Sequence, residues 1–236
     1  MNQTQEVIKV MEENGGFSTL GFLYQKVNTT DWKTKTPFAS IRRIVQDNRY
    51  FFKIKPGLWA LKKLEKDVLK KFRIDKEETS NEFNHYYYQG LLLEIGNLRG
   101  FDTFVPSQDK NKPFLDKKLV ELATINEIYH FTYQNVINRA KTVDVIWFNE
   151  RKFPSYFFEV EHSTDFQNSL LKFYDLQDFR TEFYIVSSKG RLKEYNYKIQ
   201  LGAFKEIKNR VRFVDYDFVS NLHSKSYELK KVGDLL

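Results

Sequence analysis

Cysteine is absent from the 236-residue chain, which excludes disulfide bonds and zinc sites built from thiolates. Long apolar runs are absent too, since none approaches the 18 residues of a membrane-spanning helix. The opening residues, MNQTQEVIKVMEEN, are mixed polar and do not resemble a signal peptide. We therefore expect a cytoplasmic protein with no membrane association. Because 41% of the residues are hydrophobic and 17% aromatic, the chain can bury a core.

The basic excess is confined to one end of the chain. The sequence has 38 Lys and Arg against 31 Asp and Glu; residues 1–72 contain 14 and 7 of these, so the remainder contains 24 of each. A basic N-terminal part beside a neutral remainder indicates that one part holds a polyanion on which the other acts.

The N-terminal part predicts three helices followed by a basic hairpin. Apolar residues recur at helical spacing in three segments, which begin near residue 4, at Ser18 as a cap, and at Thr36-Pro37 as cap and first helical position. Two strand-like runs, YFFKIK and LWAL, are joined by Pro56-Gly57, a pair typical of a type II turn.

This plan resembles a winged helix-turn-helix domain, and TPFASIRRIVQDNRYFFKIKPGLWAL resembles the third helix and wing of such domains attached to bacterial nucleases. The resemblance implies that the third helix enters the major groove of double-stranded DNA and that the wing follows the backbone. The residues it would place against DNA are Ser40, Arg42, Arg43, Gln46, Lys53 and Lys55. A winged helix used for protein contacts or dimerisation is the alternative.

The remainder predicts a second domain. Residues 62–82 are almost wholly charged and read as a helix followed by a linker, so we divide the chain into 1–72, a linker at 73–82, and 83–236. Elements expected in the second domain are a helix ending at Gly100, a strand at 101–105, a loop at 108–112, helix at 113–140, strands at 143–148 and 157–162, a helix at 166–179, and a strand at 182–188. This order predicts an α/β fold, with a mixed sheet flanked by helices.

Three carboxylates lie inside apolar, strand-like runs: Asp144, Glu159 and Glu161. A buried carboxylate is costly unless a cation or hydrogen-bond donors meet it, so these acids either pair with basic side chains or hold a metal. Side chains alternate along a strand, so Glu159 and Glu161 share a face, and pairing of the two strands would bring Asp144 near Glu159. Such an oxygen-rich site suits Mg²⁺.

An Asp followed by Glu-x-Glu between apolar neighbours resembles the active site of the PD-(D/E)xK nuclease superfamily, which has the restriction-endonuclease-like fold. The resemblance covers roughly residues 83–200. It implies that Asp144 and Glu159 are the two metal-binding acids and that Glu94, on the preceding helix, is a further ligand. Glu161 stands where the family usually has lysine.

Two departures leave the third catalytic group open. Val143 precedes Asp144 in place of proline, and Glu161 replaces the lysine. Either Glu161 binds a second metal or positions water, or a lysine has migrated to Lys172 or Lys189. His162 follows the motif and either contacts a phosphate or has a structural role.

These features together predict a Mg²⁺-dependent endonuclease of restriction type that hydrolyses duplex DNA. One active site per chain and two strands to cut suggest a homodimer. The alternatives are a DNA-binding regulator whose nuclease-like domain is inactive, and a winged-helix protein-interaction module that does not bind DNA.

Overall fold

The computed structural model describes residues 2–74 and 77–233. The chain divides into two compact units, one formed by Met1–Lys76 with Ser220–Leu236 and the other by Glu77–Val219.

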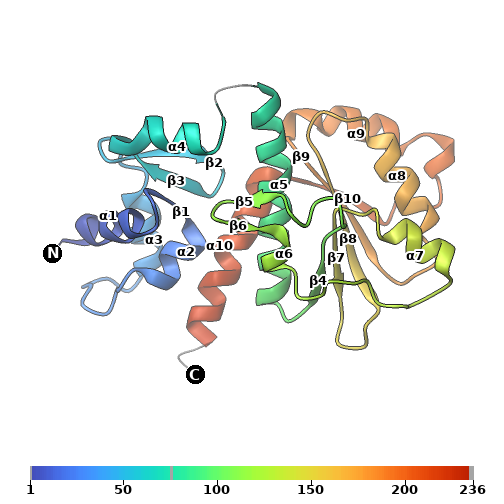
Figure 1. Ribbon diagram of the computed structural model, residues 1–236, viewed down its shortest axis with the longest axis horizontal. Coiled ribbons are helices and arrows are strands. Elements are labelled where there is room, and N and C mark those ends of the chain that lie inside the picture. Colours follow the sequence, from blue (N-terminus) through green and yellow to red (C-terminus); the bar gives the residue numbers. More distant parts are fainter. Residues whose placement is uncertain (1, 75–76, 234–236) are drawn as a thin grey trace. The chain divides into compact units, whose positions relative to one another are not determined.

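The N-terminal unit contains helices and an antiparallel sheet of strand order β1-β3-β2 (Figure 1). Its elements are α1 (Gln3–Glu13), β1 (Phe17–Thr19), α2 (Leu20–Lys26), α3 (Pro37–Ile44), β2 (Phe51–Lys55), β3 (Leu58–Leu61), η1 (Lys62–Leu64) and α4 (Glu65–Lys71). Leu23, Tyr24 and Ile41 are fully buried in its core, which α1, α2 and α3 share with β2 and β3. The three helices and the hairpin lie where the sequence predicts them.

Local chemistry explains two of these boundaries and corrects a third. Gly57 has a φ of 76°, which its lack of a side chain permits, so Pro56-Gly57 forms the turn between β2 and β3 as expected. Pro37 begins α3 as predicted. The cap of α2, however, is Thr19, whose hydroxyl accepts from the Phe22 amide at 3.2 Å, while the predicted cap Ser18 lies within β1.

The second unit is built on a five-stranded sheet of order β10-β9-β8-β7-β4. Strands β4, β7 and β8 are antiparallel neighbours, whereas β8, β9 and β10 run parallel. The elements of this unit are α5 (Glu77–Leu98), β4 (Asp102–Phe104), β5 (Pro113–Phe114), β6 (Lys117–Lys118), α6 (Leu119–Leu122), α7 (Gln134–Ala140), β7 (Val145–Phe148), β8 (Pro154–Glu161), α8 (Phe166–Asp175), β9 (Glu182–Ser187), η2 (Lys189–Arg191), α9 (Leu192–Ile199), η3 (Gly202–Phe204), β10 (Val211–Asp215) and the start of α10 (Tyr216–Gly233). The expected mixed α/β sheet flanked by helices is confirmed.

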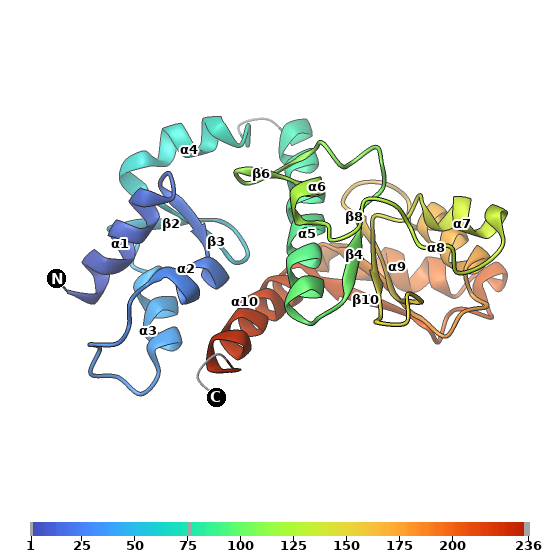
Figure 2. The same cartoon turned by 60° about the horizontal axis from the view of Figure 1, so that its bottom comes forward.

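Helices cover both faces of this sheet (Figures 1 and 2). Helix α5 packs closely on one face, where Trp147 donates from its indole nitrogen to the Leu92 carbonyl oxygen at 3.1 Å. On the other face α7, α8 and α9 bury a core around Phe157, Phe173 and Phe183. The strand ends between α5 and α8 are therefore flanked by helices on both sides.

Several predicted boundaries were wrong. Residues 113–140 do not form one helix, because they contain the β5–β6 hairpin, the short helices α6 and α7, and loops. Residues 77–82, predicted as linker, begin α5, while 75 and 76 lie outside the described residues. Residues 220–233, predicted within the second domain, group with the N-terminal unit.

Candidate active site

Asp144 and Glu159 meet at one end of the β7–β8 pair. The antiparallel register pairs Val145 with Phe158, so the next position along brings Asp144 opposite Glu159. Their side chains lie on the same face of the sheet because opposed residues point the same way. Asp144 is 7% exposed and Glu159 2% exposed. The structure thus brings together the two acids that the sequence pairs.

Asp144 is oriented by the neighbouring strand and by α5. One carboxylate oxygen, Oδ2, accepts a hydrogen bond from the Val160 amide at 2.7 Å. The other, Oδ1, lies 3.8 Å from Nε2 of His85. The first oxygen is occupied by the main chain, and the second faces the imidazole.

Lys172 of α8 supplies the cation at Glu159. Its ammonium donates to both Glu159 carboxylate oxygens, at 3.0 and 2.9 Å, and to the Thr142 carbonyl oxygen at 2.8 Å. Lys189, the other lysine considered, is exposed at the start of η2 and does not line the cleft described below. Of the two lysines, only Lys172 reaches the carboxylates.

Glu161 lies next to Glu159 on the face that meets α8. Its carboxylate accepts hydrogen bonds from the hydroxyls of Thr164 and Ser169, and it is 7% exposed. The same Ser169 hydroxyl lies 3.1 Å from a Glu159 oxygen. Because a hydroxyl has one proton, Ser169 can donate to only one of these carboxylates at a time.

Burial changes the proton affinity of the paired acids. Loss of hydration is the main cause that raises the pKa of Asp144 to about 7 and that of Glu159 to about 8, and repulsion between the carboxylates acts in the same direction. Lys172 opposes both shifts. Burial lowers the pKa of Lys172, but attraction to Glu159 and Asp144 outweighs it, so that the pKa is raised overall.

Three polar residues of the cluster were missed by the sequence reasoning. His85 and Gln89 lie four residues apart on α5 and therefore on one side of the helix. Asp109, from the loop predicted at 108–112, is 6% exposed and accepts from the Gln89 side-chain amide at 2.9 Å. His85, Asp109 and Asp144 offer ligand atoms that all lie within 4.8 Å of one another. The i, i+4 spacing of His85 and Gln89 could have indicated a shared helix face, but it does not indicate which part of the protein that face meets.

Glu94 is not brought to this cluster. It follows His85 by nine residues, about two and a half helical turns, so it points to the opposite side of α5. It is absent from the groups within metal-binding reach of one another among the residues described, and it does not line the cleft. Among the α5 side chains that line the cleft is His85, whereas the sequence predicted Glu94.

The carboxylates open into a cleft of about 490 Å³, which all of Asp144, Glu159, Glu161 and Lys172 line. His162 also lines it, and its Nδ1 lies 3.1 Å from the hydroxyl of Tyr216, whose ring it stacks on. Solvent and a ligand can therefore reach one side of the buried cluster.

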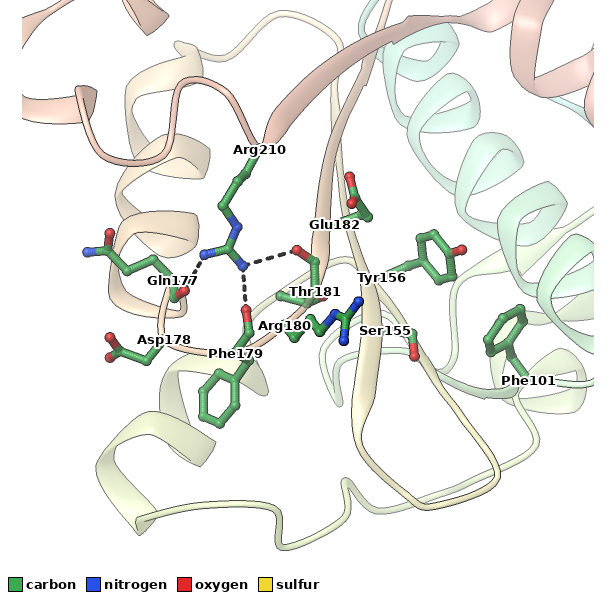
Figure 3. A pocket seen from close by; sticks show the side chains of 10 residues that line it. All are labelled: Phe101, Ser155, Tyr156, Gln177, Asp178, Phe179, Arg180, Thr181, Glu182 and Arg210. Carbon is green, nitrogen blue, oxygen red and sulfur yellow. Dashed lines mark hydrogen bonds between the residues drawn. The ribbon is translucent and has the colours of Figure 1, made fainter.

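Figure 3 shows a different hollow of the same unit, of about 590 Å³, at the other end of β8. Arg210 donates there to the carbonyl oxygens of Gln177, Phe179 and Thr181. These bonds tie the start of β10 to the loop before β9, so Arg210 has a structural role in the hollow.

The six residues predicted to contact DNA lie on α3, just after its end and on the hairpin, and they differ in exposure. Arg43, Gln46 and Lys53 are exposed, and Gln46 follows the end of α3. Ser40, Arg42 and Lys55 are half-buried. Arg42 donates to the Tyr24 hydroxyl at 3.1 Å, and burial lowers the pKa of Lys55.

Comparison with known proteins assigns the chain to a family. The family model of the type II restriction enzyme NmeDI C-terminal domain matches residues 65–234. The chain therefore belongs to the NmeDI C-terminal domain family. The type II restriction enzyme NmeDI of Neisseria meningitidis serogroup C is 26% identical over 150 residues, which are 59% of this chain and 42% of that enzyme. No solved structure matches the chain.

This NmeDI-family chain is thus restriction-enzyme-like, and the match spans less than half of the curated relative's length. The family match includes every residue of the carboxylate cluster, whereas α1, α2, α3 and the hairpin precede it. In the described part of the chain, none of the helices has the length and apolarity to cross a membrane.

Proposed function

We propose that the chain is a Mg²⁺-dependent endonuclease of restriction type that hydrolyses phosphodiester bonds in duplex DNA. The convergence of Asp144, Glu159 and Lys172 at the end of the β7–β8 pair carries the proposal. Two carboxylates facing each other, with a lysine beside them in an open cleft, support a PD-(D/E)xK site on a restriction-endonuclease-like fold. The membership in a restriction-enzyme family supports the same reaction.

The donor set fits Mg²⁺. Asp144, Glu159 and Glu161 are buried together, and Lys172 forms an ion pair with Glu159. Three carboxylates therefore lie beside one lysine, which leaves negative charge that a divalent cation can offset. In the proposal Asp144 and Glu159 hold the ion, which prefers carboxylate oxygens together with water and phosphate. A bound Mg²⁺ would polarise the scissile phosphate and make water more acidic. Glu94 has no place in this set because it lies on the far side of α5.

Lys172 is the third catalytic group in this proposal. From α8 its ammonium holds Glu159 in place and presents a positive charge at the wall of the cleft. That charge can stabilise negative charge that develops on a phosphate. Glu161 accepts hydrogen bonds from the hydroxyls of Thr164 and Ser169. We assign it a positioning role, in which it orients the Ser169 hydroxyl that also lies beside Glu159.

The N-terminal unit supplies the DNA-binding part of the proposal. Its helices, hairpin and basic excess support a winged helix-turn-helix domain at residues 1–72, with the catalytic domain in the unit Glu77–Val219. Exposed Arg43 and Gln46 would face bases or phosphates, with Ser40 and Arg42 beside them, and Lys53 with Lys55 would contact the backbone. Because both strands must be cut, two copies are proposed to act as a homodimer.

A plasmid cleavage assay with Mg²⁺ and with EDTA tests the proposal. Wild-type protein should cut supercoiled plasmid only with Mg²⁺, while Asp144→Asn and Glu159→Gln should bind the same DNA without cutting it. Binding without cleavage by the wild type, across duplexes of varied sequence and methylation, would instead support the regulator with an inactive nuclease-like domain.

A further inference from the structure

We infer that His85, Asp109 and Asp144 form a second cation site, which takes a divalent transition-metal ion and shares only Asp144 with the Asp144–Glu159 pair. The three residues come from α5, the loop after β4 and the entrance to β7. Their ligand atoms lie within 4.8 Å of one another. His85 and Asp144 line the cleft, whereas Asp109 is buried behind them, so the site has an open side and a closed side.

His85 is held as a metal ligand is held. Its Nδ1 lies 2.9 Å from the Val160 carbonyl oxygen, which can only accept, so in the neutral ring Nδ1 carries the hydrogen and Nε2 has a free lone pair. Imidazoles that bind metals are usually fixed by such a bond at the other nitrogen. Nε2 lies 3.8 Å from Asp144 Oδ1. Two ligand atoms about 2.1 Å from one ion can be separated by up to about 4.2 Å, so the spacing of His85 and Asp144 suits a shared ion.

A buried amide beside the cluster gives independent support. Gln89 is fully buried, and its Nε2 donates to Asp109 Oδ2 at 2.9 Å and to the Asp144 carbonyl oxygen at 3.3 Å. The other atom of this amide, Oε1, has no hydrogen-bond partner in the described part of the chain. Water on a bound cation can supply the missing donor.

The local charge is only partly compensated, because Lys172 acts on Asp144 without forming an ion pair with it. Asp109 and Asp144 are both buried, and among the described side chains no lysine or arginine forms an ion pair with either. Lys172 donates instead to Glu159 and Thr142. A divalent ion at this position would offset the two carboxylates.

The nitrogen ligand sets the class of ion. Mg²⁺ and Ca²⁺ take oxygen ligands, whereas imidazole favours transition metals, and mixed carboxylate and imidazole sets accept Mn²⁺. An ion here would fasten the Asp109 loop to α5 and to the entrance of β7. This role does not depend on DNA cleavage.

Mn²⁺ is the probe for this site. Full-length wild-type protein loaded with Mn²⁺ should show, by pulsed electron paramagnetic resonance, coupling of the ion to an imidazole nitrogen. The coupling should disappear in His85→Gln and weaken or disappear in Asp109→Asn. His130→Gln, which changes an exposed histidine of the same unit, and Asp178→Asn, which changes an exposed aspartate, should both retain it.

Thermal melting gives a second measurement, which does not depend on detecting the coupling between Mn²⁺ and the imidazole nitrogen. Mn²⁺ should raise the Tm of the wild type and of both control variants more than that of Asp109→Asn. Absence of nitrogen coupling in wild-type protein, or its persistence in His85→Gln, would overturn the inference. Glu159→Gln should lose cleavage yet retain the coupling, which separates failure of this site from failure of the proposed nuclease.

Discussion

The Lys172 ammonium contacts both carboxylate oxygens of Glu159, although the lysine is 13 residues further along the chain and on a different element. Strand β8 carries Glu159, and α8 crosses back over the sheet to place Lys172 against it. The position two residues after Glu159, where the resemblance leads one to expect lysine, is Glu161. The cation that pairs with Glu159 is therefore supplied by a helix.

Replacement of Lys172 tests whether this cation takes part in cleavage. Lys172→Met retains the length of the side chain but removes its charge, and loss of one stabilising group of this kind costs about 100-fold or more in kcat. Lys189→Met should cleave like the wild type because that lysine is exposed outside the cleft. Single-turnover cleavage rates decide the matter, and equal loss in the two variants would contradict the role of Lys172.

The metal-free protein should lose stability as the pH rises. Asp144 and Glu159 have raised pKa values of about 7 and about 8 in the folded state, against ordinary values of 3.8 and 4.5. The folded protein therefore binds more protons than the unfolded chain between about pH 4 and pH 8, and its free energy of unfolding falls across this window.

Denaturant unfolding in EDTA at a series of pH values measures this dependence. Glu159→Gln, which removes one of the two titrating groups, should flatten the decline, and divalent ions should oppose it. A wild-type stability that increases from pH 5 to pH 8 under these conditions would show that the carboxylates are not destabilised by burial.

The salt dependence of DNA binding should come from the exposed basic residues of the N-terminal unit. Each phosphate contact contributes a slope of roughly −0.9 to log K against log salt, so Lys53→Ala should reduce the slope by about 1 on any duplex. If Arg43 contacts a guanine edge, Arg43→Ala should cost about 1–3 kcal/mol and relax sequence preference. Lys205→Ala, an exposed lysine of the second unit, is the matched control. Unchanged slopes in both variants would place DNA recognition elsewhere.

Close packing of α5 on the sheet should make Gly96 intolerant of a side chain. A Cβ built there would lie 2.5 Å from a Thr103 side-chain carbon and 2.8 Å from the Trp147 indole nitrogen, both in buried residues. Gly96→Ala should therefore lower the free energy of unfolding by about 1–3 kcal/mol. At Gly202 nothing lies within 4 Å, so Gly202→Ala should be nearly neutral. Chemical denaturation compares the two.

The sequence alone determined the features that rest on local periodicity. Alternation along β8 and the short loop after β7 are enough to predict that Asp144 meets Glu159, because strand register follows from the apolar pattern and the connection. Pro37 and Pro56-Gly57 likewise mark the start of α3 and the turn between β2 and β3, since proline and glycine restrict the backbone directly. The irregular stretch at 113–140 was wrongly predicted as helix because short hairpins and helices leave no sustained period.

Only the tertiary structure decided which side chains complete the cluster. In its second half, helix α5 has consecutive buried apolar residues, such as Leu91, Leu92 and Leu93, so its sequence does not reveal which side meets the sheet. The structure shows that His85 and Gln89 face the site while Glu94 points away. Choosing Lys172 over Lys189 required the position of α8 on the sheet, and including Asp109 required the path of a loop. These contacts join segments distant in sequence, and their geometry is set by packing between elements, on which local residue patterns carry no information.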